Sequence, residues 1–113
     1  MAITVTVLYA NVPGGRVDVQ KYLTGHAPKV IKEMGPFGLR GVRAVQLHGS
    51  PIKPGADKQY LLQVSLDWDS LEAFNVAFKA TSERLMGDID SFSNLSPLVM
   101  YGEIVLEQKL QVM

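Results

Sequence analysis

The chain has 113 residues and a formal net charge of zero, with 11 Lys plus Arg against 11 Asp plus Glu. This length suits one domain with one core, and a neutral chain has no long-range field to attract nucleic acid or anionic lipid. Because there is no cysteine, disulfides, thiolate metal sites and a cysteine nucleophile are excluded. The N-terminus alternates like a strand rather than a signal peptide, and no apolar run approaches the ~20 residues that span a bilayer. We therefore expect a cytoplasmic protein that binds neither nucleic acid nor membrane.

The first half of the chain predicts a strand, a helix and a second strand. Residues 3–9 alternate between two faces, which is typical of a β-strand. From Asp18, a candidate N-cap, apolar residues recur at helical spacing as far as Met34. Pro28 lacks an amide hydrogen and crowds the preceding turn, so we expect a kink or a break just before it. Residues 39–48 alternate again and predict the second strand.

The second half predicts a strand, a helix and a last strand. Residues 59–68 place alternate apolar side chains on one face. Asp69 and Glu72 have the spacing of a capping box, with Asp69 at the N-cap, and the helix should continue to about Met86. Residues 97–106 alternate once more and predict the fourth strand.

The order of these elements is βαββαβ. Two right-handed crossovers place both helices on one face of a four-stranded antiparallel sheet. The sequence therefore predicts the α+β class with a ferredoxin-like fold, as a single domain over residues 1–113.

The sheet face that the helices leave uncovered decides the expected assembly. Such a face should be polar in a monomer, yet apolar residues occur on both faces of the strands. We expect a homodimer in which two sheets pack together; the alternative is a monomer with some exposed apolar surface. The residues expected on the uncovered face are Leu8, Leu47 or Ala44, Leu61, Val99, Tyr101 and Val105.

Several short motifs, in order along nearly the whole chain, resemble the EthD family. They are Val7-Leu8-Tyr9, Asp18 to Tyr22, His26-Ala27-Pro28, Gly38-Leu39-Arg40-Gly41, Asp69-Ser70-Leu71-Glu72-Ala73-Phe74 and Asp88-Ile89-Asp90-Ser91-Phe92-Ser93-Asn94. The resemblance implies a dimeric α/β barrel, which is a version of the ferredoxin-like fold. Related barrels include cofactor-free oxygenases, polyketide cyclases and decarboxylases, and haem enzymes, so the resemblance implies a pocket rather than one reaction.

His26 is the candidate catalytic residue. It lies on the apolar stripe of the first helix, beside the expected irregularity at Pro28. Imidazole exchanges protons near neutral pH, which suits proton transfer to or from an acidic carbon or a phenol. The alternative is a core histidine bonded to a nearby carbonyl. The resemblance, in which this His-x-Pro recurs, favours the catalytic role.

Other polar groups give weaker signals. His48 ends the second strand and is read as a loop-edge residue. Two distant histidines do not predict a metal site, and two short helices offer little cover for haem, so we expect no metal and no cofactor. Asp88 and Asp90 lie in a serine-containing loop and are read as a solvated turn, although paired carboxylates can also do acid–base work.

Aromatic side chains and one amide supply the expected substrate contacts. Phe74 and Phe78, at helical spacing, could equally be core, and the Tyr9 and Tyr22 hydroxyls could bind a ligand or a backbone carbonyl. The full predicted set is Tyr9, Tyr22, Trp68, Phe74, Phe78, Phe92 and Asn94.

Together these features predict a protein with a pocket for a small hydrophobic molecule that is aromatic or bears a carbonyl group. The hypothesis is a cofactor-independent enzyme that uses His26 as acid or base for oxidation, cyclisation, dehydration or decarboxylation. The alternative is a non-catalytic dimer that carries a ligand or accompanies a larger enzyme.

Overall fold

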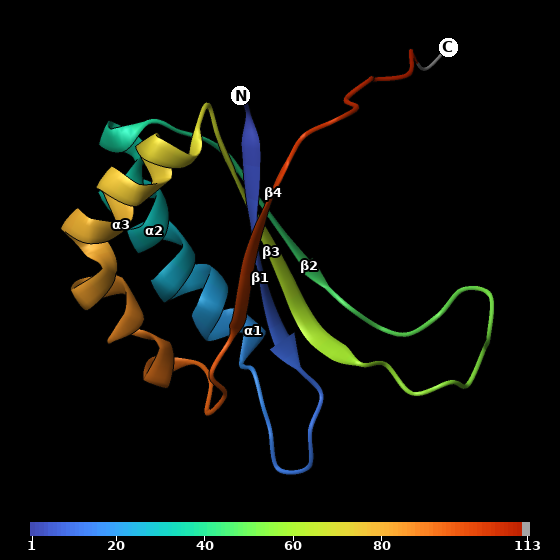
Figure 1. The fold of residues 1–113 in the computed structure, drawn as a ribbon. Helices are drawn as coiled ribbons and strands as arrows, with labels where there is room; N and C mark the ends of the chain where they lie inside the picture. Colours follow the sequence, from blue (N-terminus) through green and yellow to red (C-terminus); the bar gives the residue numbers. More distant parts are fainter. Residues whose placement is uncertain (112–113) are drawn as a thin grey trace.

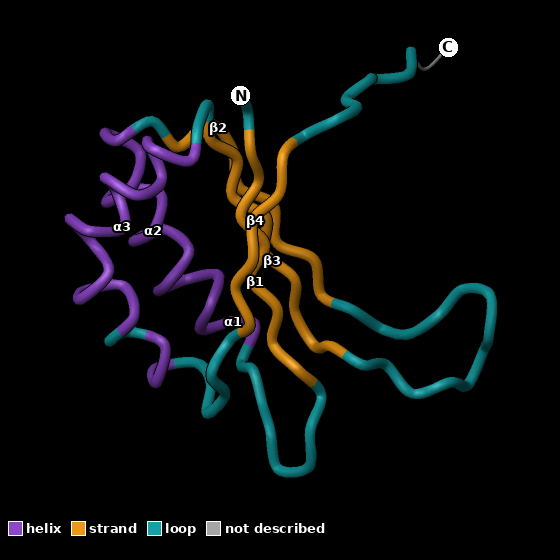
Figure 2. Tube along the Cα trace, viewed as in Figure 1, coloured by secondary structure: helices purple, strands orange, loops and turns teal. Residues whose placement is uncertain are grey.

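The computed structural model describes residues 1–111 and confirms the βαββαβ order and the ferredoxin-like fold. All helical segments lie on one side of a single antiparallel sheet, whose strand order is β2-β3-β1-β4 (Figures 1 and 2). Residues 112 and 113 of the predicted domain lie outside this description. The elements are β1 (Ile3–Ala10), α1 (Val19–Lys21), η1 (Tyr22–His26), α2 (Ala27–Met34), η2 (Gly35–Phe37), β2 (Leu39–Gln46), β3 (Tyr60–Trp68), α3 (Leu71–Met86), η3 (Ile89–Ser91) and β4 (Leu98–Glu103).

The core lies between the helices and the two central strands. On β1, alternate residues point toward the helices, and each is paired with a buried residue of β3, as in the pair of Val5 with Leu66. From α3, Ala77 packs against this layer with no exposed surface. No helix within residues 1–111 is both long enough and apolar enough to cross a membrane.

The register of the strands corrects the predicted composition of the uncovered face. Val99 and Tyr101 lie opposite Val7 and Val5, so they share the helix side of the sheet, as does Ala44 opposite Val64. Directly paired residues in antiparallel strands point to the same face. The uncovered face carries Leu8, as predicted, and, in place of the misassigned residues, Leu98 and Met100 from β4 and Val45 from β2, among Thr and Ser residues. It is therefore mixed in polarity.

The first helix is continuous but contains one wide turn. Asp18 is its N-cap, as predicted, and accepts a hydrogen bond from the Lys21 amide at 3.1 Å. The predicted kink takes the form of the π-helical segment η1, where the amide of Ala27 bonds back to the carbonyl of Tyr22. A π turn holds one extra residue, which accommodates a proline that can donate no amide hydrogen. Pro28 then lies in the first turn of α2.

The second helix begins one residue later than predicted. Ser70 is the N-cap, and its hydroxyl accepts a hydrogen bond from the Ala73 amide at 3.1 Å. The predicted capping box is therefore wrong, because Glu72 is then the second helical residue rather than the third. The Asp69 carboxylate lies 3.4 Å from Nε of Arg40 instead.

The two edge strands are shorter than predicted. β2 ends at Gln46 rather than at residue 48, and β4 ends at Glu103 rather than at residue 106. The reason is clear for β4, because its partner β1 begins at Ile3. One further bond joins the Ile104 amide to the Ala2 carbonyl. Beyond that point the chain has no strand beside it to pair with.

Candidate functional site

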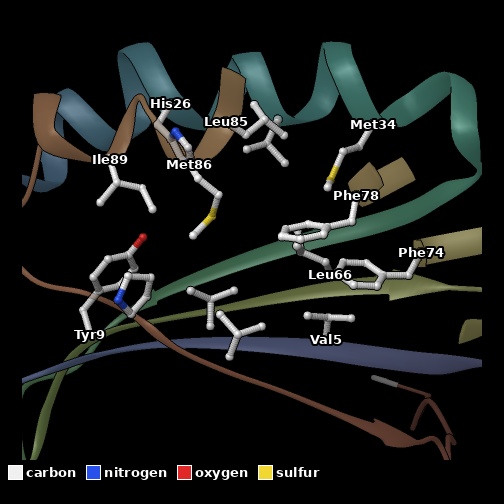
Figure 3. A pocket seen from close by; sticks show the side chains of 14 residues that line it. Val5, Tyr9, His26, Met34, Leu66, Phe74, Phe78, Leu85, Met86 and Ile89 are labelled. Atoms are coloured by element: carbon white, nitrogen blue, oxygen red, sulfur yellow. The ribbon is translucent and has the colours of Figure 1, made fainter. Parts of the chain in front are cut away.

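A cavity of about 80 Å³ lies between the helices and the sheet. This volume can hold several water molecules or a small organic group. Its lining is apolar except for His26 and Tyr9, which lie at one end, whereas Phe74 and Phe78 lie at the other (Figure 3). The cavity is open on one side, because Phe78 and other lining residues are partly exposed. A smaller adjoining cavity of about 50 Å³ shares His26 and Tyr9 and reaches Tyr22.

His26 reaches this cavity from the π turn. The side chain is 10% exposed, and its Nδ1 lies 3.0 Å from Oδ2 of Asp88, which follows α3. The other carboxylate oxygen of Asp88 lies 3.3 Å from Nζ of Lys29, one turn further along the first helix. The hydrogen bond from His26, with that from Lys29, lowers the pKa of Asp88 below its ordinary value. Asp88 is therefore an ionised carboxylate at neutral pH.

The contact with Asp88 defines the tautomer of His26. An ionised carboxylate can only accept hydrogen bonds, so Nδ1 must carry the hydrogen that points at Asp88. In the neutral ring, Nε2 then holds the lone pair. Nε2 is therefore the ring atom that can exchange a proton, while Asp88 holds the ring through Nδ1.

Two aromatic rings, those of Phe92 and Tyr22, pack against the imidazole of His26, and Tyr9 packs against Phe92. Phe92 is the nearest, at 4.9 Å between ring centroids, and it makes edge-on contacts with Tyr22 at 5.3 Å and Tyr9 at 5.8 Å. All three rings are at most 3% exposed. Their packing restrains the imidazole and keeps the surroundings of the His26–Asp88 pair apolar.

The two tyrosine hydroxyls cannot serve as bases under ordinary conditions. Burial raises the pKa of Tyr22 to about 12, and burial, with a contribution from Tyr22, raises the pKa of Tyr9 further. Both side chains therefore stay neutral. A neutral phenol near a ligand donates a hydrogen bond, so these groups can orient an oxygen atom.

The other predicted site residues lie in three different environments. Phe74 and Phe78 stack on each other with centroids 5.5 Å apart and both line the cavity. Trp68 is 1% exposed and packs edge-on against Phe74 from outside the lining, with its indole nitrogen unpartnered among residues 1–111. Asn94 instead accepts from the Arg16 amide and donates to the Gly14 carbonyl, which joins two loops. His48 is exposed and lies outside the lining.

Within the described residues, His26 and Asp88 are not part of a group of side chains that could bind a metal ion. Across residues 1–111, no three His, Cys, Asp or Glu side chains are grouped as metal ligands. A histidine whose Nδ1 is held by a carboxylate can exchange a proton at Nε2.

Solved structures of small ferredoxin-like proteins resemble this chain. An EthD-like protein from Ralstonia eutropha is 27% identical, with a TM-score of 0.85, over 95% of each chain. The chain is EthD-like. An EthD family protein from Bacillus halodurans is 22% identical, with a TM-score of 0.64, over 93% of this chain and all of that one. A dimeric ferredoxin-like protein from an uncultured marine organism is 10% identical, with a TM-score of 0.61, over 97% and 92%.

The predicted resemblance to the EthD family is thus confirmed by the Ralstonia eutropha structure, and the other two structures show the fold alone. The chain matches no model of a protein family and no curated protein.

Sequence reasoning about this EthD-like chain missed Asp88 and Lys29. The local sequence predicts a solvated turn for Asp88, whereas the residue pairs with a histidine 62 positions away. One signal was available: His26 and Lys29 are three residues apart, so a helix places both on one face, where a carboxylate would serve both. The contributions of Met34 and Met86 to the lining were also missed, since a methionine on a helix is read as core.

Proposed function

We propose that this EthD-like chain holds a small, largely apolar molecule in the cavity and that His26 exchanges a proton with it. The observation that carries the proposal is the 3.0 Å contact between His26 Nδ1 and Asp88 Oδ2 beside an apolar cavity that His26 itself lines. Asp88 holds the ring in one tautomer and in one orientation. These are the two tasks of an orienting partner in general acid–base catalysis.

The lining suggests the chemical class of the ligand. Polar atoms gather only at the end with His26 and Tyr9, so the ligand would carry one polar group there, such as a phenolic hydroxyl or an enolisable carbonyl (Figure 3). Its apolar remainder would lie against Phe74 and Phe78. A hydroxyl of Tyr9, or of Tyr22 in the adjoining cavity, would donate to the ligand oxygen.

The remaining predicted contacts take indirect roles in this proposal. Phe92 would hold the imidazole in place, and Trp68 would support Phe74 from behind. Asn94, which joins two loops, would keep the segment that carries Phe92 in position.

Proton transfer by His26 fits several reactions. Cyclisation, dehydration and decarboxylation each begin or end with such a step, and removal of a proton also forms the electron-rich anion that oxidation consumes. We propose that the chain carries out this step without a tightly bound cofactor. A carrier would use the same cavity, with His26 only donating a hydrogen bond, so binding and proton exchange must be measured separately.

We propose in addition that the chain works as a homodimer. Several solved structures of this fold are described as dimeric. The partly apolar uncovered face, with Leu98 and Met100 about half exposed, provides a surface for the second copy.

The test uses a ligand whose colour reports its protonation. Thermal shift with a panel of phenols, quinones and β-keto compounds would first identify binders, because a ligand at 100 times its dissociation constant adds about 2.7 kcal/mol of stability. 4-Nitrophenol would then be added to the wild type, to His26→Gln and to the matched control His48→Gln, which alters the exposed histidine.

The expected result is that all three proteins bind the phenol but only the wild type and His48→Gln ionise it. The same protonation state in His26→Gln and the wild type would overturn the proton-exchange role and favour a carrier. If no compound of the panel stabilises the wild type, the proposal of a ligand site for this class fails altogether.

A further inference from the structure

Two buried hydroxyl groups beside His26 have no partner of their own. Tyr9 and Tyr22 are 2% and 3% exposed, yet neither hydroxyl is hydrogen-bonded to another group of residues 1–111. Burial raises the pKa of both phenols, and no hydrogen bond to the ionised form opposes it. A buried hydroxyl without a hydrogen bond raises the free energy of the folded protein. Two such groups in one place indicate a site whose polar partner is supplied by a ligand.

Both phenols line the adjoining cavity of about 50 Å³, and His26 lines it with them. Figure 3 shows the Tyr9 hydroxyl, in red, pointing from the sheet toward the helices. Tyr22 contributes to the raised pKa of Tyr9, so the two phenols are near each other. A cavity of this volume has room for one small polar group. The remaining lining is apolar and consists of Val7, Val30, Val64 and Leu66. The two hydroxyls can therefore converge on one oxygen atom of a ligand.

The two cavities separate one donor from the base. His26 lines both of them, whereas Tyr22 lines only the smaller one. A ligand with its oxygen in the smaller cavity and its body in the larger one thus passes His26 with the atoms next to the oxygen-bearing carbon. In a phenol the acidic proton is on the oxygen itself, where base and donors would compete for space. In a ketone the acidic proton is on the neighbouring carbon, which matches the separation of His26 from Tyr22.

We infer that Tyr9 and Tyr22 together form an oxyanion hole for an enolate, and that the chain acts on ketones with a hydrogen on the carbon next to the carbonyl. This inference rests on the proposed proton exchange by His26 and narrows its substrate.

The step is a proton transfer that needs no further reactant. The C–H bond next to the carbonyl breaks, and its proton goes to Nε2 of His26. The electron pair of that bond forms a carbon–carbon double bond, and the π pair of the carbonyl moves onto the oxygen. Tyr9 and Tyr22, both neutral, donate hydrogen bonds to this oxygen. Donors that are in place before the charge develops stabilise it most effectively.

The test is the exchange of the hydrogens next to the carbonyl for deuterium in D2O, followed by NMR. The probes are acetone, cyclohexanone and 2-indanone, which are ketones of increasing size, and each rate is measured above that of buffer alone. Tyr9→Phe and Tyr22→Phe each remove one hydroxyl. The matched control, Tyr101→Phe, removes the hydroxyl of a tyrosine that is 57% exposed and lines neither cavity. Unfolding midpoints are measured as well, because losing a hydroxyl that has no partner should not destabilise the fold.

The expected result is that the wild type and Tyr101→Phe accelerate exchange of at least one ketone. Tyr9→Phe and Tyr22→Phe should each be slower by about a hundredfold, the loss typical of one missing oxyanion donor, with unfolding midpoints no lower than that of the wild type.

Three outcomes would overturn the inference: no exchange by the wild type, exchange by either cavity variant at the wild-type rate, or a lower unfolding midpoint in either variant, which would mean that the hydroxyl has a structural role. The 4-nitrophenol experiment separates this failure from that of the proposed function, because the acidic hydrogen of that probe is on its oxygen. If the wild type ionises 4-nitrophenol but exchanges no ketone, the proton-exchange role of His26 stands and only the ketone class fails. If it does neither, both proposals fail.

Discussion

The two ends of the cavity are built by the same helices and the same sheet, yet they differ in how firmly their side chains are held. At the His26 end, the imidazole is bonded to Asp88, and the ring of Phe92 packs against it. At the other end, Phe78 is 40% exposed (Figure 3). Under the proposed function the two ends would have different tasks. The group that transfers protons would be held in one geometry, and a ligand would enter at the more exposed end.

We expect the largest loss of stability when the phenyl ring of Phe92, which packs against His26, is removed. Phe92 is 3% exposed and contacts His26, Tyr9 and Tyr22. Phe92→Ala should lower the free energy of unfolding by about 3 to 5 kcal/mol, the usual cost of deleting a buried phenyl ring. Chemical denaturation would measure it.

The matched change at the open end is Phe78→Ala. Because that ring is 40% exposed, we expect a loss of about 1 kcal/mol, which is typical of partly buried positions. Equal losses for the two variants would mean that the ends do not differ in rigidity, and the comparison would fail.

The next prediction concerns the loss of stability when the charge of Asp88, at the His26 end of the cavity, is removed. Asp88→Asn keeps the shape but weakens the hydrogen bonds to His26 and Lys29, so it should cost about 1 to 2 kcal/mol at pH 7. The folded-state pKa of Asp88 is lowered, so its contribution is complete above the unfolded carboxyl pKa near ~4 and disappears as the pH falls through the lower folded value.

The free energy of unfolding, measured from pH 7 to pH 2, checks this prediction. The loss of stability on acidification should be smaller in Asp88→Asn than in the wild type, and the two curves should approach each other at the acid end. A constant gap between the curves would show that Asp88 matters for packing rather than for its charge.

The sequence could predict those features of the fold that depend on local patterns. Alternation and helical spacing are local signals, so they defined the four strands, the N-cap at Asp18 and the apolar stripe that carries His26. Strand faces were harder, because the register between β1 and β4 decides which side Val99 occupies. That register depends on pairing between segments about 90 positions apart, and no local pattern contains it.

The site itself was only half predictable for the same reason. His26 and four of the predicted aromatic residues line the cavity system, because an apolar stripe points at the core wherever the helix lies. Asp88 was not found, since its importance comes from a helix end that tertiary packing brings to His26. Asn94 was misplaced because a polar residue next to Phe92 can equally well point at a neighbouring loop.

We expect the smallest effect on stability from breaking an ion pair that joins the two helices near the open end of the cavity. Arg84 donates from Nε and Nη2 to the two carboxylate oxygens of Glu33 at 3.1 and 3.0 Å, and this contact lowers the pKa of Glu33. The neighbouring residues Met34 and Leu85 line the cavity, so the pair ties α2 and α3 together beside it. Because the pair is at the surface, Glu33→Gln should lower the thermal midpoint only slightly, and by less than Asp88→Asn. The difference from the wild type should shrink in about 1 M salt, where charges are screened within about 3 Å. A difference that persists in salt would mean that Glu33 acts through packing, and that the open end is held more firmly than its exposure indicates.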